Sequence, residues 1–136
     1  MSTPTLVAKW QSRAPQLLSI LRMVAAFMFM QAGTMKLFGW PMTMPDGTTA
    51  KLLTQVGIGG MLEVFGGGLL LIGLFTRPVA FLLSGEMAVA YFQFHAPQAM
   101  WPIVKQGQPA VLYCFIWLYL SAAGPGPWSV DAALRK

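Results

Sequence analysis

Two glutamates lie inside the most apolar stretches of this chain, where an ionisable side chain is costly. Glu63 falls in residues 59–75 and Glu86 in residues 79–96, and they are two of the four acidic residues. An ionised carboxylate near the midplane of a bilayer costs at least about 2.5 kcal/mol. Carboxylates held at such depth bind ligands, relay protons or pair with a cation, so both glutamates are candidate functional residues.

Arg22 is the predicted partner of both glutamates. A rise of 1.5 Å per residue places Arg22 roughly 8 Å, Glu86 roughly 10 Å and Glu63 roughly 17 Å from the inner membrane face. Arginine favours bidentate pairing with carboxylates. One arginine shared by two carboxylates would leave one of them able to take up and release a proton. Two interpretations remain open: a proton-handling or substrate-binding site, and a polar network that fixes the helix register.

A second polar group is predicted nearer the outer face, with Lys36, Tyr91 and His95 as its ligand- or proton-handling candidates. Tyr91 and His95 are four residues apart and therefore share one face of a helix. His95 is the sole histidine of the chain, and an unperturbed histidine titrates near neutral pH. An interfacial position at the end of a span is the competing interpretation of His95.

Four apolar segments are expected to position these side chains. Hydrophobic residues make up 56% of the 136 residues and charged residues only 10%, against about 25% charged in a soluble domain. A membrane span needs about 20 largely apolar residues, and the matching segments are residues 17–38, 52–75, 79–96 and 106–123. The chain is therefore predicted to be all-α, a membrane four-helix bundle over residues 17–124 between an N-terminal segment, 1–16, and a tail, 125–136.

The basic residues near the span ends predict the orientation of this bundle. The inner side would carry Lys9, Arg13, Arg77, Arg135 and Lys136, and the outer side Lys36, Lys51 and Lys105. Cytoplasmic loops carry an excess of Lys and Arg, so both termini are expected in the cytoplasm. The expected location is the cell inner membrane, with several passes.

Span two carries a series of glycines at a spacing of seven. Gly59, Gly66 and Gly73 follow this period, and Gly60 and Gly67 lie beside the first two. Such glycines form a seam along which another helix can approach closely. Because Glu63 is one helical turn from four of these glycines, its carboxylate is expected to face a neighbouring helix.

Several kinds of chemistry are not expected from one copy of this chain. The single cysteine, Cys114, allows no internal disulfide, no CxxC pair and no thiolate metal cluster. No metal-ligand spacing, phosphate loop or nucleophile elbow occurs, so no metal site is predicted. The nine basic residues are spread singly between apolar segments, which argues against nucleic acid as a partner.

The chain resembles the DoxX family of small four-helix membrane proteins. The segments that carry the resemblance run in family order: Arg22, residues 32–37 (AGTMKL), 62–67 (LEVFGG), 73–77 (GLFTR), 86–91 (EMAVAY), His95, 124–126 (GPG) and 129–131 (SVD). They extend from about residue 17 to residue 131. The resemblance implies a multi-pass inner-membrane protein and points to the polar positions Arg22, Lys36, Glu63, Glu86 and His95.

The resemblance also implies a redox setting. Some relatives are linked to a membrane-associated oxidoreductase complex in oxidative-stress defence, and more distant ones are similar to subunits of thiosulfate:quinone oxidoreductase. The expected function is a membrane subunit associated with redox chemistry of a quinone or a small sulfur species. It would have no cofactor of its own, with quinone or a partner oxidoreductase supplying the redox group, and it could form a homo-oligomer in the lipid bilayer. A small oligomeric proton-coupled transporter and a non-catalytic anchor or assembly protein are the alternatives, so enzymatic activity is left open.

Overall fold

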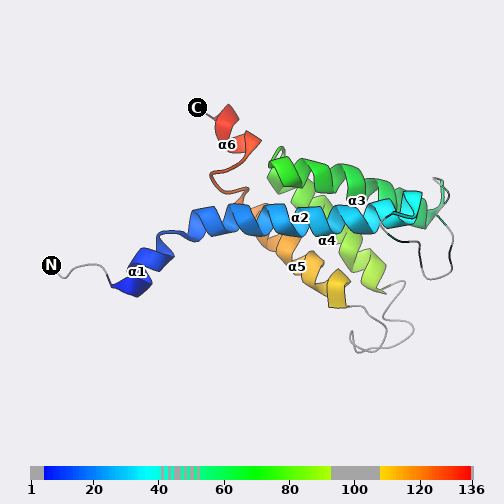
Figure 1. Ribbon diagram of the computed structural model, residues 1–136, viewed down its shortest axis with the longest axis horizontal. Helices are drawn as coiled ribbons and strands as arrows, with labels where there is room; N and C mark the ends of the chain where they lie inside the picture. The colour runs from blue at the N-terminus through cyan, green and yellow to red at the C-terminus, as the bar shows by residue number, and fades with distance from the viewer. Residues whose placement is uncertain are drawn as a thin grey trace.

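All of the described elements of the chain are helices, which confirms the predicted all-α class. The computed structural model describes residues 5–40, 53–92 and 108–135, together with positions 42, 44, 47, 49 and 51. The helices are α1 (Leu6–Gln11), α2 (Ala14–Phe38), α3 (Gln55–Ile72), α4 (Thr76–Ala90), α5 (Gln108–Ala123) and α6 (Val130–Leu134). Figure 1 shows α1 beyond, and α6 beside, the end of the assembly of α2 to α5 at which α2 begins.

The ends of the two longest helices follow from local sequence. Pro15 lies in the first turn of α2, where its missing N–H costs nothing, and Gly39 ends the helix in a left-handed conformation with φ of 68°. The Thr54 side chain accepts a hydrogen bond from the Gly57 amide and caps the start of α3. Gly73, also left-handed, ends α3.

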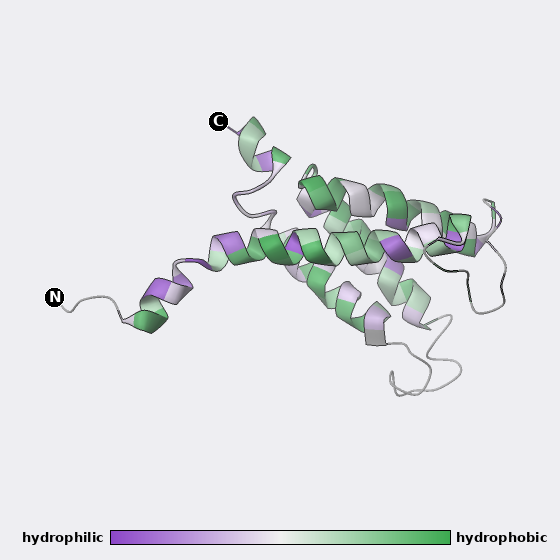
Figure 2. Ribbon diagram, in the orientation of Figure 1, coloured by the Kyte–Doolittle hydropathy of each residue, from purple (hydrophilic) through white to green (hydrophobic). Residues whose placement is uncertain are grey.

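Two helices of the described part of the chain are long and apolar enough to cross a membrane. They are α2, with 25 residues, and α3, with 18, while Pro109–Ala123 is a shorter apolar helix. Predicted spans one and two therefore correspond to α2 and α3. Predicted span three is represented by the 15 residues of α4, and its last four residues, 93–96, lie outside the described residues. Figure 2 shows mainly hydrophobic residues along α2 to α5 and several hydrophilic ones on α1.

The helices pack as two neighbouring pairs. α2 runs along α3, α4 runs along α5, and α3 contacts α4. The interior between the pairs is filled by large side chains, of which Phe29, Leu83 and Trp117 have at most 1% exposure. Phe29 meets the ring of Trp117 edge-on at a centroid distance of 5.4 Å, which joins α2 to α5.

The predicted glycine seam of α3 is confirmed. A β-carbon placed at Gly33 of α2 would lie 2.7 Å from the Gly60 carbonyl oxygen, and one at Gly67 would lie 2.6 Å from Met30 Cγ. Real β-carbons do not approach other atoms so closely. The absence of side chains at these positions therefore allows α2 and α3 to approach within backbone contact.

Candidate functional site

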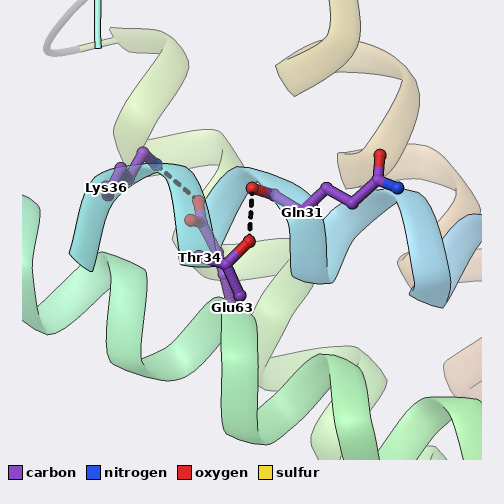
Figure 3. A network of polar contacts seen from close by, with 4 residues as sticks. All are labelled: Gln31, Thr34, Lys36 and Glu63. Atoms are coloured by element: carbon purple, nitrogen blue, oxygen red, sulfur yellow. Dashed lines mark hydrogen bonds and ion pairs between the residues drawn. The ribbon is translucent and has the colours of Figure 1, made fainter. Parts of the chain in front are cut away.

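A buried ion pair joins the end of α2 to the middle of α3. The Lys36 ammonium lies 2.6 Å from Glu63 Oε1, and the exposed fractions of the two side chains are 26% and 2% (Figure 3). The expectation that Glu63 faces a neighbouring helix is thus confirmed. The partner of Glu63, however, is Lys36, which the sequence analysis assigned to the second polar group, near the outer face.

The glycine contact explains why this pair can form. A β-carbon at Gly33 would lie 2.9 Å from Glu63 Cβ, so the backbone of α2 passes directly over the base of the glutamate. Lys36 follows Gly33 by three residues and therefore extends from the same face of α2. Thr34, drawn beside the pair in Figure 3, donates its hydroxyl proton to the Gln31 carbonyl at 3.0 Å within its own helix.

Glu86 brings a second carboxylate to this ion pair from α4. A β-carbon at Gly59 would lie 3.2 Å from Glu86 Oε2, so the carboxylate lies against the glycine seam of α3. Glu86 interacts electrostatically with both Lys36 and Glu63. We call Lys36, Glu63 and Glu86 the carboxylate site.

A cavity of about 300 Å³ opens beside the carboxylate site. Lys36 and Glu86 line it together with residues from the first two turns of α3 and the last turn of α4. Its other lining residues are Gln55, Val56, Ile58, Gly59, Leu62, Val89 and Ala90. A mainly apolar wall with a few convergent polar groups is the usual construction of a small-molecule site.

The carboxylate site has unused capacity for hydrogen bonds. Glu63 Oε2 and Glu86 Oε1 are both buried, and neither has a hydrogen-bond partner among the described residues. Buried polar atoms normally have partners, so these two oxygens call for an explanation. Two carboxylates next to one ammonium can accept a proton or a donor group from a ligand.

The predicted pairing of Arg22 with Glu63 and Glu86 is wrong. The Arg22 side chain is fully buried, and its guanidinium donates to the backbone carbonyls of Pro125 and Trp128, with the second bond 2.7 Å long. These carbonyls belong to the segment after α5, which folds back over the start of α2. The physical reason is that backbone carbonyls satisfy a guanidinium as well as carboxylates can, without burying further charge.

The tail after α5 is anchored at several further points. Ser19 Oγ donates to the Pro125 carbonyl at 3.3 Å and accepts from the Trp128 amide at 3.1 Å. Gly126, with φ of 82°, passes so close that a β-carbon there would lie 2.2 Å from Ser19 Oγ. We call residues 124–135, together with Ser19 and Arg22, the C-terminal latch.

Asp131 extends the C-terminal latch to the start of α4. Its carboxylate accepts from the amides of Phe75 and Thr76, both at 2.9 Å, and its own amide donates to the Gly73 carbonyl at 2.9 Å. It therefore caps α4 from outside that helix. Partial burial favours a higher pKa for Asp131, but the hydrogen bonds from Thr76 and Phe75 outweigh burial and bring the pKa below its ordinary value.

The remaining members of the second polar group are not brought to the carboxylate site by the described structure. Tyr91 follows α4 and lines a different cavity, between α4 and α5, together with Met87 and Cys114. Its ring meets that of Phe92 edge-on at 5.5 Å. His95 lies outside the described residues.

One candidate near the site was missed by the sequence reasoning. Tyr113 of α5 stacks on Trp117 at a centroid distance of 5.8 Å and interacts electrostatically with Glu63. Trp117 Nε1 is buried with no partner among the described residues. The available signal was the spacing of four between Tyr113 and Trp117, which places both rings on one helix face.

No three metal-ligating side chains gather within the part of the chain that the structure describes. Arg22, Glu63, Lys36 and Glu86 are all placed, and three of the four form the carboxylate site. Tyr91 is placed outside this site, and His95 lies outside the described residues.

Comparison with known proteins identifies the family. The sequence pattern of the DoxX family matches residues 17–96. The chain is also 39% identical over 125 residues to a Haemophilus influenzae protein described as an uncharacterized protein, covering 90% of this chain and 93% of that relative. No solved structure matches the chain. The match includes every residue of the carboxylate site, and the apolar helices agree with the membrane association of the family. The chain belongs to the DoxX family of membrane proteins.

Proposed function

We propose that this protein is a membrane subunit associated with redox chemistry, in which the carboxylate site binds the polar head of a quinone or a small sulfur species. The observation that carries the proposal is the pair of buried carboxylate oxygens without partners, Glu63 Oε2 and Glu86 Oε1, beside the Lys36 ammonium. Ionisable groups at membrane depth are expensive and mark substrate or proton pathways.

The proposal includes a membrane placement. α2 to α5 are the four spans of a bundle in the cell inner membrane, with both termini in the cytoplasm. Support comes from the length and apolar character of α2 and α3, and from Lys9, Arg13, Arg77 and Arg135, which belong to the end that carries α1 and α6. Lys36 and Lys51 then lie toward the outer side.

A quinone head fits the chemistry of the donors in the cavity. A quinone ring is apolar on its faces and accepts hydrogen bonds at two carbonyl oxygens, and the cavity offers apolar walls with an ammonium at one side. Lys36 donates to one carbonyl oxygen and is held in place by Glu63. Conversion of a quinone to a quinol takes up two electrons and two protons. Glu86 lines the cavity and, in this proposal, exchanges protons with the bound ring.

The electrons in this scheme come from a partner. The sequence carries no flavin or iron–sulfur motif, so an oxidoreductase subunit outside this chain supplies or accepts the two electrons. The chain itself binds and orients the ring, excludes water by means of Ile58, Leu62 and Val89, and provides the carboxylates.

The two carboxylate oxygens without partners also support a second candidate, a small proton-coupled carrier. A cation that enters the cavity would find Glu63 and Glu86 as ligands if Lys36 moved aside. Four spans are few for alternating access, so this function requires an oligomer.

The test is a binding titration with the protein in lipid nanodiscs. A short-tail ubiquinone is added while tryptophan fluorescence is followed, with thiosulfate as a competing ligand in a parallel series. The compared variants are Lys36→Gln, Glu86→Gln and Lys9→Gln, the last of which removes the same charge as Lys36→Gln from exposed helix α1. We expect saturable binding that weakens about tenfold in the two site variants and is unchanged in Lys9→Gln.

Three outcomes contradict this proposal. If the wild type and both site variants bound quinone equally well, the carboxylate site would not be the quinone-binding site. The carrier would be established instead if the protein bound neither quinone nor thiosulfate but moved cations into liposomes under a pH gradient. This cation flux would have to stop in the Glu86→Gln variant. If the protein neither bound quinone or thiosulfate nor carried cations, and if Glu63→Gln still co-purified with the partner protein, the protein would be an anchor.

A further inference from the structure

A further cavity lies at the opposite end of the molecule from the carboxylate site. It has a volume of about 530 Å³, is open to the outside, and is lined by the start of α2, the start of α4, the end of α5 and the C-terminal latch. Its charged lining residues are Arg77 and Arg135, and Tyr119 adds a phenol. Neither the family match nor the proposed quinone site accounts for this cavity.

Arg77 presents donors at this cavity in a fixed position. Its Nη1 donates to the carbonyls of Ser121 and Ala122 at the end of α5, which holds the guanidinium against that helix. Nε and Nη2 are left with no acceptor among the described residues. Two parallel N–H groups of an arginine match the geometry of phosphate oxygens.

The charge around the cavity favours an anion. The described residues at this end carry a single carboxylate, Asp131, which accepts hydrogen bonds from the amides of Phe75 and Thr76 and interacts electrostatically with Arg135. The basic side chains at the same end are Lys9, Arg13, Arg22, Arg77 and Arg135. Since Arg22 is buried against backbone carbonyls, Arg77 and Arg135 are the two that reach this cavity.

The surroundings of the cavity are those of a membrane–water interface. Trp10, Tyr119 and Trp128 belong to this end and are 66%, 62% and 53% exposed. Aromatic side chains with one polar group concentrate at the level of lipid headgroups. The arginine pair therefore lies where a phosphodiester would be found, with apolar side chains such as Leu118 of α5 continuing toward the bilayer interior.

We propose that Arg77 and Arg135 bind the phosphate group of one anionic phospholipid in this cavity, with its acyl chains along the outer surface of α5. Basic pockets between helices at the cytoplasmic face are known sites for such headgroups. The inference rests on the membrane placement proposed above but not on any ligand of the carboxylate site.

The test is native mass spectrometry of the whole protein released from nanodiscs that contain equal amounts of phosphatidylglycerol and phosphatidylcholine. Arg135→Gln is the main variant, because Arg135 is exposed; among the described residues its side chain interacts electrostatically with Asp131. Arg77→Gln is the second. Lys9→Gln, at the same end but outside the cavity, and Lys51→Gln, at the other end, remove the same charge as controls.

We expect one phosphatidylglycerol to be retained by wild type and by both lysine variants, with about tenfold weaker retention in Arg135→Gln. Equal retention of the two lipids by wild type would overturn the proposal, as would equal losses in Lys9→Gln and Arg135→Gln. A site that takes up inorganic phosphate but shows no lipid preference would also overturn it. Retention of phosphatidylcholine by every variant checks that the membrane placement is intact.

Discussion

The carboxylate site and the C-terminal latch both bury charge, but they satisfy it in different ways. In the latch, both Nη groups of Arg22 donate hydrogen bonds to backbone carbonyls, so a single charge is stabilised by neutral carbonyl dipoles. The carboxylate site gathers an ammonium and two carboxylates, and leaves two of their oxygens without partners. A charge surrounded by backbone stabilises one conformation, whereas carboxylates with unused oxygens can still react or bind. The comparison favours a structural role for the C-terminal latch, where Arg22 Nε is the one guanidinium nitrogen without a partner among the described residues, and it supports the functional role proposed for the carboxylate site.

The largest effect is expected from Glu63→Gln. The amide is isosteric with the carboxylate, so the fold should persist, and Lys36 can extend its ammonium toward solvent. Loss of a charged partner from a proton-handling group lowers rates by roughly 100-fold or more. The measurement is quinone-dependent turnover in membranes that contain the protein and its partner, with Glu63→Asp as a variant that keeps the charge. If Glu63→Gln turned over quinone at the wild-type rate, Glu63 would have no role in the reaction.

The next effect is expected from Arg22→Ala, which should destabilise the protein by about 3 kcal/mol because two charge-assisted hydrogen bonds are lost. Unfolding in increasing SDS measures the change. Arg13→Ala is the matched control, since Arg13 is exposed on the same helix and makes no side-chain capping bond. Adding Glu63→Gln to Arg22→Ala should not restore stability. Restoration would mean that arginine and glutamate are paired after all.

A smaller loss, about 2 kcal/mol, is expected from Gly126→Ala. The new methyl group would meet Ser19 Oγ, and the backbone would keep a left-handed φ that alanine disfavours. Gly85→Ala is the control, because a β-carbon there meets no atom within 4 Å. It should leave stability unchanged or raise it by up to about 1 kcal/mol. Thermal unfolding of both variants in one detergent makes the comparison, and equal melting temperatures would contradict the close approach of the latch to α2.

The smallest effect is expected from Asp131 and depends on pH. Because its pKa is lowered in the folded protein, the ionised carboxylate stabilises the fold above the ordinary pKa of about 4, and this stabilisation is lost as pH falls through the lower folded value. Asp131→Asn should cost about 1 kcal/mol at neutral pH and flatten the loss of stability below about pH 4. An unchanged acid profile in Asp131→Asn would show that another group is responsible.

The helices and the two glutamates could be predicted from the sequence, but the partner of Glu63 could not. Counting residues along a helix gives the depth of a side chain, and by depth alone Arg22 and Glu63 looked compatible. Counting residues does not give the direction in which a side chain points around the helix. Lys36 reaches Glu63 because Gly33, which has no side chain, lets the backbones of α2 and α3 lie close together. This approach depends on which two helices are in contact, and one segment of sequence does not specify it.

The latch was hidden for a related reason. The predicted fourth segment, residues 106–123, ends where α5 ends, at Ala123. The carbonyls of Pro125 and Trp128 bind Arg22 from 103 and 106 residues away, and no local pattern records such a pairing. The short helices α1 and α6 likewise fell in segments that hydropathy treated as tails.

The cap on α4 has a consequence for the order in which the protein is made. Phe75 and Thr76 receive their acceptor from a residue 56 and 55 positions later in the chain. During translation, α4 leaves the ribosome long before Asp131 does, so its first turn stays incomplete until residue 131 has been synthesised. Residues that are made late thus close a helix that is made early, and a product that stops at Gly124 would lack both the Asp131 cap and the Trp128 carbonyl that accepts from Arg22.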